Sequence, residues 1–293
     1  MSTHVPIPKR LYKSGVELSI IGLGGIVVCG IPQDDANQIV AEAFERGVNY
    51  YDVAPTYFDG EAEIKLGHAL RPYRSRVFLA CKTEKRDAAG AQAALEESLR
   101  RAHTDYFDLY QFHAVTTMEE LEQIFAPGGA AEVFLKAKQA GKVRFLGASC
   151  HSVEAAIALM DRFPLDSILF PINFVNYVRV HFGPQVIEHA QRKGVARLAL
   201  KAMAHRPWRQ GEPHTHPKAW YKPVDDRALA RLALRFTLSE DVTAAIPPGD
   251  SDHFRFAMDV AADFTPLTHQ ERVALLSAAN DVEPIFRYPA VAA

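Results

Sequence analysis

Residues 46–67 read RGVNYYDVAPTYFDGEAEIKLG and contain the local pattern that decides the fold. An arginine and a glycine end a helix, and a short apolar stretch, residues 48–52, follows. Glycine suits the end of a helix because it adopts positive φ, and a basic residue before it complements the helix dipole. The same pattern recurs at residues 139–149 and 192–200, which read QAGKVRFLGAS and RKGVARLAL. A buried strand that repeatedly follows a helix indicates βαβ units and a parallel sheet.

Eight strand–helix pairs are expected along the 293 residues, a length that suits one (β/α)8 TIM barrel. An N-terminal β-hairpin, residues 10–19 with its turn at Ser14 and Gly15, precedes the first pair, and additional helices follow the last strand. The strands are expected at residues 20–23, 48–52, 77–81, 107–112, 143–148, 167–170, 195–200 and 242–245. The helices are expected at residues 34–46 (capped by Asp34), 61–70, 88–102, 118–139 (interrupted at 127–129), 153–161, 184–192, 225–237, 251–261 and 268–279.

This arrangement predicts one domain spanning residues 1–293, with residues 1–8 and 284–293 as peripheral tails. The longest irregular segment is residues 204–224, which follows the seventh strand. A loop of this length within a compact domain is usually functional.

The composition argues against several classes of protein. The formal net charge is −2, with both signs interspersed, so neither nucleic acid nor a membrane surface is an expected partner. No apolar run approaches the roughly 18 residues of a membrane span, and the first residues lack the apolar segment of a secretory signal. The three cysteines, Cys29, Cys81 and Cys150, are far apart and form no CxxC motif. This sparse set favours a reducing compartment, and we expect a cytoplasmic protein.

Polar side chains stand at the carboxyl ends of the expected strands, where βα barrels place their active sites. They are Asp52, Lys82, His113, Ser149 and Asn173, with Tyr57 in the loop after Asp52. Asp52 and Lys82 end neighbouring strands and are expected to pair, because either charge alone would be costly in a half-buried barrel mouth. A nearby ammonium lowers the pKa of a tyrosine from about 10 towards the working range of a proton donor. The set suits protonation of a carbonyl that receives hydride from a cofactor.

Several motifs, in the same order along the chain, make it resemble the aldo-keto reductase family. DVAPTYFDGEAEIKLG at residues 52–67 is similar to the D-x-A-x-x-Y…E-x-x-L-G segment of that family. CK at 81–82 and DLYQFH at 108–113 resemble its lysine and histidine strands. GKVRFLGAS at 141–149 resembles G-K-x-R-x-x-G-x-S, and IPPGDS at 246–251 resembles I-P-G-x-S with one residue more.

The resemblance implies a catalytic tetrad acting on a small-molecule aldehyde or ketone, or on the alcohol in the reverse reaction. Tyr57 would protonate the carbonyl oxygen, and Lys82 would lower the pKa of Tyr57. Asp52 would hold Lys82 in place, and His113 would orient the carbonyl.

The resemblance also implies a nicotinamide cofactor. Ser149 and Asn173 would hold the carboxamide of the nicotinamide, and Ser251 and Arg255 would lie near the adenosine 2′-phosphate. NADP(H) is therefore the expected cofactor. NAD(H) is not excluded, because Asp250 places a negative charge beside the expected phosphate site.

Three aromatic residues are expected to shape the substrate pocket. Phe58 stands where the family commonly has glycine, directly after the tyrosine, so it is expected to narrow the mouth. Trp208 and Trp220 lie in the long segment at residues 204–224 and are expected to form a wall of the pocket.

Other interpretations of the same residues remain open. Asp52 and Lys82 by themselves suit a structural ion pair, and Ser149 suits a helix cap. His214 and His216 lack a third ligand nearby in the sequence, so no metal is expected. The alternative functions are a cofactor-binding regulatory or redox-sensing barrel with little turnover, and an aldolase that forms a Schiff base on Lys82. The oligomeric state cannot be read from the sequence.

Overall fold

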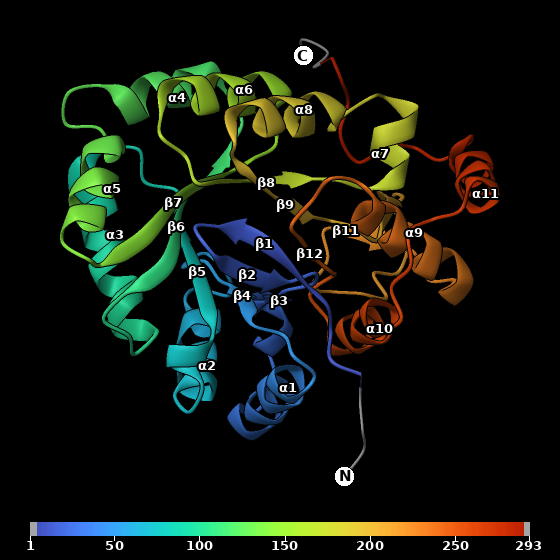
Figure 1. The fold of residues 1–293 in the computed structure, drawn as a ribbon, viewed down its shortest axis with the longest axis horizontal. Coiled ribbons are helices and arrows are strands. Elements are labelled where there is room, and N and C mark those ends of the chain that lie inside the picture. The colour runs from blue at the N-terminus through green and yellow to red at the C-terminus, as the bar shows by residue number, and fades with distance from the viewer. Residues whose placement is uncertain (1–4, 290–293) are drawn as a thin grey trace.

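A computed structural model describes residues 5–289 of the protein. An eight-stranded parallel sheet curls around its centre (Figure 1). Its strands, in sheet order, are β3 (Leu23–Gly24), β4 (Tyr50–Asp52), β5 (Phe78–Thr83), β6 (Phe107–Val115), β7 (Val143–Cys150), β8 (Ser167–Pro171), β9 (Ala196–Leu200) and β12 (Ala244–Ile246). The two edges meet where Ile21 bridges Ala245 in parallel, and the Gly22 N–H donates to the Ala245 carbonyl at 2.9 Å. The sheet is thereby closed into a barrel, which confirms the expected fold class.

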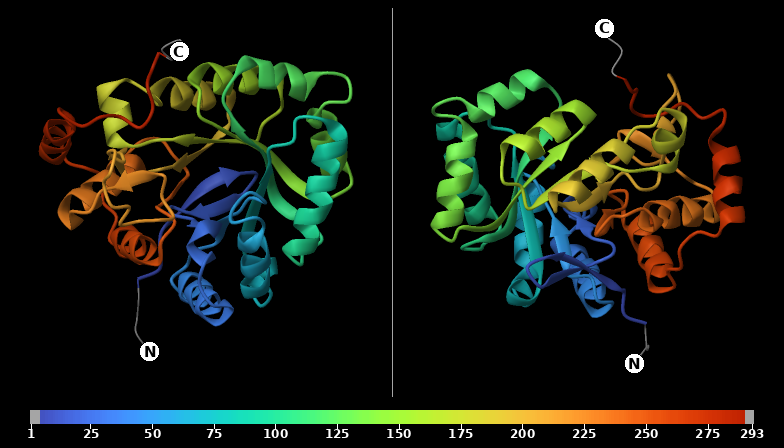
Figure 2. Two further views of the ribbon diagram at one scale, coloured as in Figure 1. Left: turned by 180° about the vertical axis from the view of Figure 1, so that it is seen from behind. Right: turned by 45° about the horizontal axis from the view of Figure 1, so that its top comes forward.

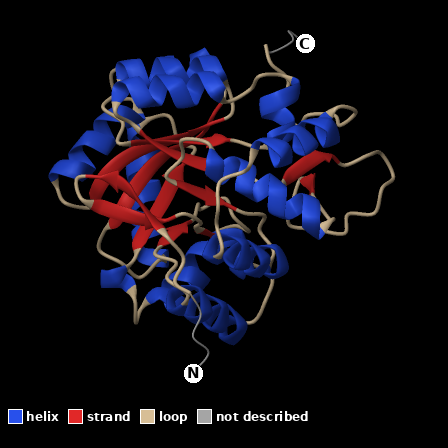
Figure 3. Ribbon diagram, turned by 45° about the vertical axis from the view of Figure 1, so that its right-hand side comes forward, coloured by secondary structure: helices blue, strands red, loops and turns tan. Residues whose placement is uncertain are grey.

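Helices form an outer layer around the strands (Figure 3). They are α1 (Gln33–Glu45), α2 (Glu61–Leu70), α3 (Ala88–Arg101), α4 (Met118–Phe125), α5 (Ala130–Gln139), α6 (Val153–Arg162), α7 (Phe174–Arg179), α8 (Pro184–Lys193), α9 (Arg227–Ser239), α10 (Ser251–Ala262) and α11 (His269–Ala279), with short 3-10 turns η1 (Gly25–Val28) and η2 (Arg74–Arg76). The break expected at residues 127–129 separates α4 from α5. Every helix among residues 5–289 is too short or too polar to cross a bilayer.

The sequence predicted most elements within a few residues, with four differences. The first strand begins at Leu23 rather than at residue 20, because residues 20 and 21 lead from the hairpin into the barrel. Asp34 lies inside the first turn of α1, and Pro32 takes the cap position. Helix α7 and the antiparallel pair β10 (Ala204–Pro207) and β11 (Tyr221–Pro223) were not predicted; the pair lies apart from the barrel sheet in Figure 3.

The N-terminal hairpin closes the amino ends of the barrel strands. Strands β1 (Lys9–Lys13) and β2 (Val16–Ser19) pair as expected, with positive φ at Ser14 and Gly15, and lie across the barrel in Figure 1. Tyr12 packs its ring edge against Phe78, and its hydroxyl donates to Oγ of Ser167 at 2.9 Å. The carboxyl ends of the strands are left open for a site.

The C-terminal helices extend one side of the barrel, where α11 is the outermost element in both views of Figure 2. Leu275 and Ala279 of α11 join a small apolar cluster with Phe174 of α7 and Phe236 of α9. This cluster anchors the segment that leads to Phe286, a residue that reaches back towards the open end of the barrel.

Candidate active site

A buried ion pair lies at the carboxyl ends of β4 and β5. Asp52 ends β4, and Lys82 lies near the end of β5 on the neighbouring strand. The Lys82 ammonium contacts Oδ1 of Asp52 and donates to the Val53 carbonyl at 3.1 Å. Neither residue is more than 2 % exposed, so water screens the pair little. The structure thus contains the pairing expected from the strand ends.

The second oxygen of Asp52 is held by two neutral donors. The Tyr50 hydroxyl donates to Oδ2 at 3.2 Å, and the Gln111 amide donates to the same atom at 3.0 Å. Tyr50 begins β4, Gln111 lies in the middle of β6, and both side chains are buried. The carboxylate is therefore fixed from three sides, and its orientation towards Lys82 has little freedom.

Tyr57 completes the cluster from the loop between β4 and α2. Lys82 donates a hydrogen bond to the Tyr57 hydroxyl at 3.2 Å. After Tyr57 the chain turns through three consecutive residues with positive φ, Phe58, Asp59 and Gly60, and α2 begins at the next residue. Such a turn is costly for residues other than glycine, so the neighbouring packing must enforce it. The turn keeps Tyr57 directly beside the ion pair.

Burial and charge act in opposite directions on these groups. Burial raises the pKa of Tyr57, and this exceeds the opposing effect of Lys82, so the phenol is protonated at neutral pH. The expected lowering of the Tyr57 pKa by Lys82 is present but is outweighed, because burial removes the water that would stabilise a phenolate. Burial alone would lower the pKa of Lys82, yet Asp52 and Tyr57 raise it overall, so the ammonium keeps its charge.

His113, near the end of β6, faces the same cluster as a neutral imidazole. Its ring lies edge-on to the Tyr57 ring with the centroids 5.8 Å apart, and its Nδ1 lies 3.5 Å from Oε1 of Glu84. Burial, together with the charges of Lys82 and Arg86, lowers the pKa of His113 to about 2. A neutral ring beside a proton donor can hydrogen-bond a substrate oxygen without adding charge.

A cavity of about 220 Å³ opens between these side chains. Asp52, Tyr57, Lys82, His113 and Ser149 line its floor and walls. Further walls come from Gly24 at the end of β3, Ile26 in η1, Lys201 after β9, residues 218–221, Ile246 at the end of β12, and Pro247 and Gly249 after it. The cavity therefore collects the ends of most barrel strands at one point, which is where barrel enzymes bind their ligands.

The match to a known family decides what this barrel is. Residues 20–253 match the model of the aldo/keto reductase family. The chain belongs to the aldo-keto reductase family. It is therefore an NAD(P)H-dependent oxidoreductase, and the proteins that it resembles include other oxidoreductases. It is 26 % identical over 280 residues to L-galactose dehydrogenase of Arabidopsis thaliana, covering 87 % of each chain. It is 27 % identical to the structure of the aldo-keto reductase AKR11C1 from Bacillus halodurans in its holo form, with a TM-score of 0.74 and coverage of 95 % and 98 % of the two chains.

A third relative resembles this reductase in fold. The aldo-keto reductase from Klebsiella pneumoniae, solved in complex with NADPH, is 21 % identical, with a TM-score of 0.71 and coverage of 96 % and 97 % of the two chains. At this identity the likeness concerns the fold alone.

Ser149 and Asn173 of this reductase lie at the ends of β7 and β8. Ser149 caps no helix: its Oγ accepts the Ala114 N–H at 2.8 Å, and Ser152 caps α6. Oδ1 of Asn173 accepts the Asn176 N–H at 2.9 Å and caps α7, but the buried Nδ2 of Asn173 has no hydrogen-bond partner within the described part of the chain. An unpaired buried amide is costly, but Asn173 is fully buried and does not line the cavity, so a ligand would reach this donor only after neighbouring groups move.

The residues expected at the adenosine end are arranged differently from the expectation. Ser251 is the first residue of α10, and Arg255 lies one turn later, where its guanidinium donates to Glu42 of α1 at 2.8 Å. Neither side chain lines the hollow of about 330 Å³ beside the start of α10. Asp250 and His253 line it instead.

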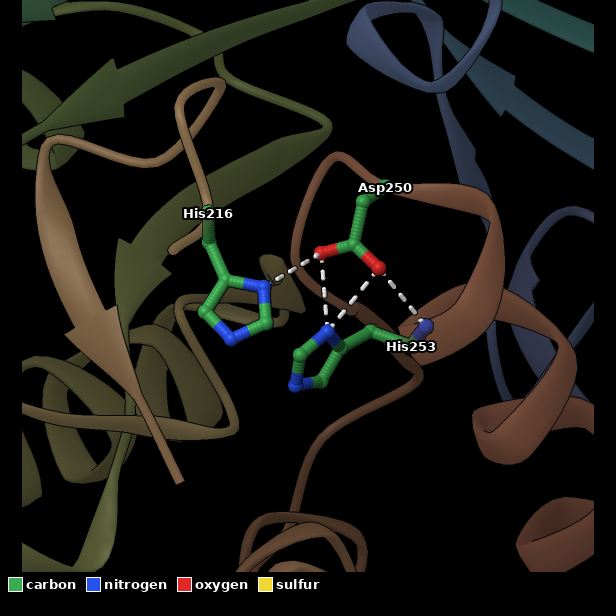
Figure 4. Close-up of side chains that lie close together, drawn as sticks. All are labelled: His216, Asp250 and His253. Carbon is green, nitrogen blue, oxygen red and sulfur yellow. Dashed lines mark hydrogen bonds and ion pairs between the residues drawn. The ribbon is translucent and has the colours of Figure 1, made fainter. Parts of the chain in front are cut away.

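Asp250 lies between two imidazoles (Figure 4). Nδ1 of His253 lies 2.9 and 2.8 Å from its two oxygens, and Nδ1 of His216 lies 3.7 Å from Oδ2. The ligand atoms of these three residues lie within 4.8 Å of one another, and Nε2 of His216, on the far side of its ring, lies 2.9 Å from Oδ1 of Asp225. The two imidazoles thus contact the Asp250 carboxylate from two sides.

Of the three aromatic residues expected at the pocket, the structure brings only Trp220 to the cavity. The Trp208 indole N–H donates to the Ala219 carbonyl at 2.9 Å, and its ring stacks on His214 away from the cavity. Phe58 is 48 % exposed and does not line the cavity, because the left-handed turn after Tyr57 directs it outward.

Among the residues of this cavity that sequence reasoning missed are Lys201 and His151. Each follows a barrel strand directly, so the rule that selected Lys82 and His113 would have found them. All three cysteines are buried, and burial raises the pKa of each thiol, to about 11 for Cys29. Buried thiols of this kind are poor redox sensors.

Proposed function

We propose that this protein reduces an aldehyde or ketone with hydride from NADPH, and that Tyr57 donates the proton to the carbonyl oxygen. The observation that supports this most is the chain of contacts from Asp52 through Lys82 to the Tyr57 hydroxyl, which ends at the cavity. A protonated phenol beside a fixed ammonium can release its proton as negative charge develops on a substrate oxygen.

The neighbouring side chains have separate roles in this proposal. Lys82 stabilises the phenolate that remains after proton transfer, and Asp52 keeps Lys82 charged and in position. The neutral His113 orients the carbonyl oxygen towards Tyr57 by a hydrogen bond. The small cavity limits the water around these groups, which strengthens each electrostatic interaction.

The nicotinamide cofactor, when bound, supplies the hydride. Ser149 and Asn173 would hold its carboxamide; Ser149 lines the cavity, and the buried Nδ2 of Asn173 has no hydrogen-bond partner among residues 5–289. The preference for NADPH rests on membership of the aldo-keto reductase family. Ser251 and Arg255 stay the proposed residues near the 2′-phosphate, although Arg255 would first have to leave Glu42.

Substitution of Tyr57 by phenylalanine tests the proposal. NADPH binding, measured by fluorescence titration, should be unchanged, while turnover of a panel of aldehydes should fall by a factor on the order of 10³. Tyr73→Phe is the matched control, because the Tyr73 ring stacks on Phe44 at 4.3 Å and would keep that contact. Full activity of the Tyr57→Phe protein would refute the assigned role. NADPH binding without turnover of any aldehyde by the unmodified protein would instead indicate a regulatory barrel.

A further inference from the structure

Lys201 is held in the mouth of the barrel by an unusual backbone. It directly follows β9, and its φ is +63°, in the left-handed region that residues other than glycine rarely adopt. This conformation directs the side chain into the cavity that also contains Lys82 and His113. A strained backbone that places a cation in an active-site cavity indicates a functional role rather than a structural one.

Among residues 5–289, the ammonium of Lys201 has no carboxylate partner. It lies 3.2 Å from Nε2 of His151, and it lies over the rings of Trp220 and Phe286 at 5.4 and 5.8 Å from their centroids. No ion pair to Lys201 occurs among residues 5–289. Burial, with a contribution from Lys82, lowers the pKa of Lys201 to about 7, as expected for a cation without a counter-charge.

His151 orients this ammonium. The imidazole stacks on Phe286 with the centroids 5.4 Å apart and the planes at 17°, so the ring is fixed. Burial lowers the pKa of His151 well below its ordinary value, so the ring is neutral. Since an ammonium can only donate, Nε2 of His151 accepts the hydrogen bond, and the remaining N–H groups of Lys201 are free for a ligand.

The charges around the cavity are unbalanced. Three lysines line it, Lys82, Lys201 and Lys218, and the one carboxylate among the lining residues, Asp52, is already paired with Lys82. Lys218 lies towards the expected adenosine end: its ammonium donates to the Val27 carbonyl at 3.2 Å, and it experiences the charge of Asp250. Lys201 lies on the other side, near His113. An anion next to Lys201 would therefore lie close to the reacting carbonyl.

We propose that Lys201, oriented by His151, binds a carboxylate carried by the substrate, and that the preferred substrates are oxo acids: aldehydes or ketones with an anionic group. This rests on the proposed reductase function and adds a substrate class to it. The rings of Trp220 and Phe286 form the apolar wall between the anionic group and solvent. The carboxylate supplies the counter-charge that Lys201 lacks within the described part of the chain.

Steady-state kinetics with pairs of equal shape test this directly. The pairs are 4-carboxybenzaldehyde with 4-carbamoylbenzaldehyde, and 4-oxobutanoate with 4-oxobutanamide. The unmodified protein should prefer each carboxylate by about tenfold or more in kcat/KM, the effect of one charge-assisted hydrogen bond. Lys201→Met should lose this preference through a higher KM for the carboxylates, with kcat for the amides within about twofold. Lys201→Arg should retain part of it. Lys136→Met, at a surface position, is the control for a lost positive charge.

Two further measurements separate the possible failures. An unchanged preference in Lys201→Met overturns the proposal, and a weaker NADPH affinity of that variant, measured by fluorescence, would assign Lys201 to the cofactor diphosphate instead. If the unmodified protein turns over none of the four carbonyls, the proposed function has failed on these substrates, and calorimetry then decides the subsite alone. In that case, 4-(hydroxymethyl)benzoate should bind the NADP-loaded protein more tightly than its amide, and the difference should vanish in Lys201→Met; equal binding of the two alcohols by the unmodified protein would overturn the subsite.

Discussion

Replacing Lys82 by methionine should destabilise the protein and also abolish its activity, because this one ammonium holds three oxygens together. It contacts Oδ1 of Asp52, the Val53 carbonyl at 3.1 Å and the Tyr57 hydroxyl at 3.2 Å. Methionine has a similar volume and leaves no large cavity, so the change removes charge and hydrogen bonds rather than packing.

The magnitude follows from what remains around Asp52. Removing one partner of a buried ion pair costs about 3–5 kcal/mol, since the other charge is left without compensation. Here Asp52 keeps two neutral donors, Tyr50 at 3.2 Å and Gln111 at 3.0 Å. These reduce the penalty, and we expect a loss of about 3 kcal/mol in the free energy of unfolding. Without the ammonium, the burial that already raises the pKa of Tyr57 is no longer opposed, and turnover should fall at least about 100-fold.

Equilibrium unfolding in urea, followed by circular dichroism, measures the first effect, and steady-state turnover of an aldehyde measures the second. Lys136→Met is the control: this side chain is 72 % exposed and pairs with Glu132 one helical turn away, so its loss should change stability by less than about 0.5 kcal/mol. The double variant Asp52→Leu with Lys82→Met should be less destabilised than the sum of the single variants.

A loss below about 1 kcal/mol for Lys82→Met would refute this reasoning, because it would mean that water screens the pair. Strict additivity in the double variant would have the same meaning. A stability loss with unchanged turnover would leave the ion pair as a structural feature and would remove Lys82 from the mechanism.

Three further outcomes are expected. Lys201→Met should stabilise the protein at pH 7 by up to about 4 kcal/mol, because folding lowers the pKa of this amine from 10.5 to about 7. This stabilisation should shrink as the pH rises towards 10, and urea titrations of both proteins at pH 7 and pH 10 would measure the difference. The pKa of His113 is about 2 in the folded protein, whereas the imidazole of the unfolded chain takes up a proton below about pH 6.5. Between pH 7 and 5 the unmodified protein should therefore lose about 2 kcal/mol more stability than His113→Gln. If urea titrations show the same loss of stability for both proteins, the imidazole is solvated. Gly67→Ala should cost about 1–3 kcal/mol in the free energy of unfolding, because the new Cβ would lie 2.6 Å from the backbone of Ala102; an unchanged thermal midpoint would show that α2 moves freely.

The alternation of helix ends and buried strands along the chain was sufficient to predict the barrel. Glycines after basic residues end helices whatever surrounds them, and parallel strands need apolar residues on both faces, so these signals are local. The same rule placed Asp52, Lys82, His113 and Ser149 at one end of the barrel, and the structure has them lining one cavity. The sequence missed α7 and the β10–β11 pair, because six helical residues and two short strands inside loops carry too little periodicity to be recognised.

What a side chain touches was decided by the tertiary structure. Trp208 and Trp220 lie in the same segment, yet only Trp220 reaches the cavity, because the Ala219 carbonyl holds the indole of Trp208 on the outer side. The sequence showed the charge of Asp250, but not that His216, far away along the chain, would lie against it.

The sequence by itself determined the barrel and the row of polar strand ends, because both depend on the order of residues along one strand or helix. The balance of burial against charge at Tyr57 depends on neighbours that only folding brings together, and so does the surrounding of Lys201, which contains no carboxylate from residues 5–289. Desolvation and Coulomb energies are properties of three-dimensional distances, which is why the tertiary structure alone decided them.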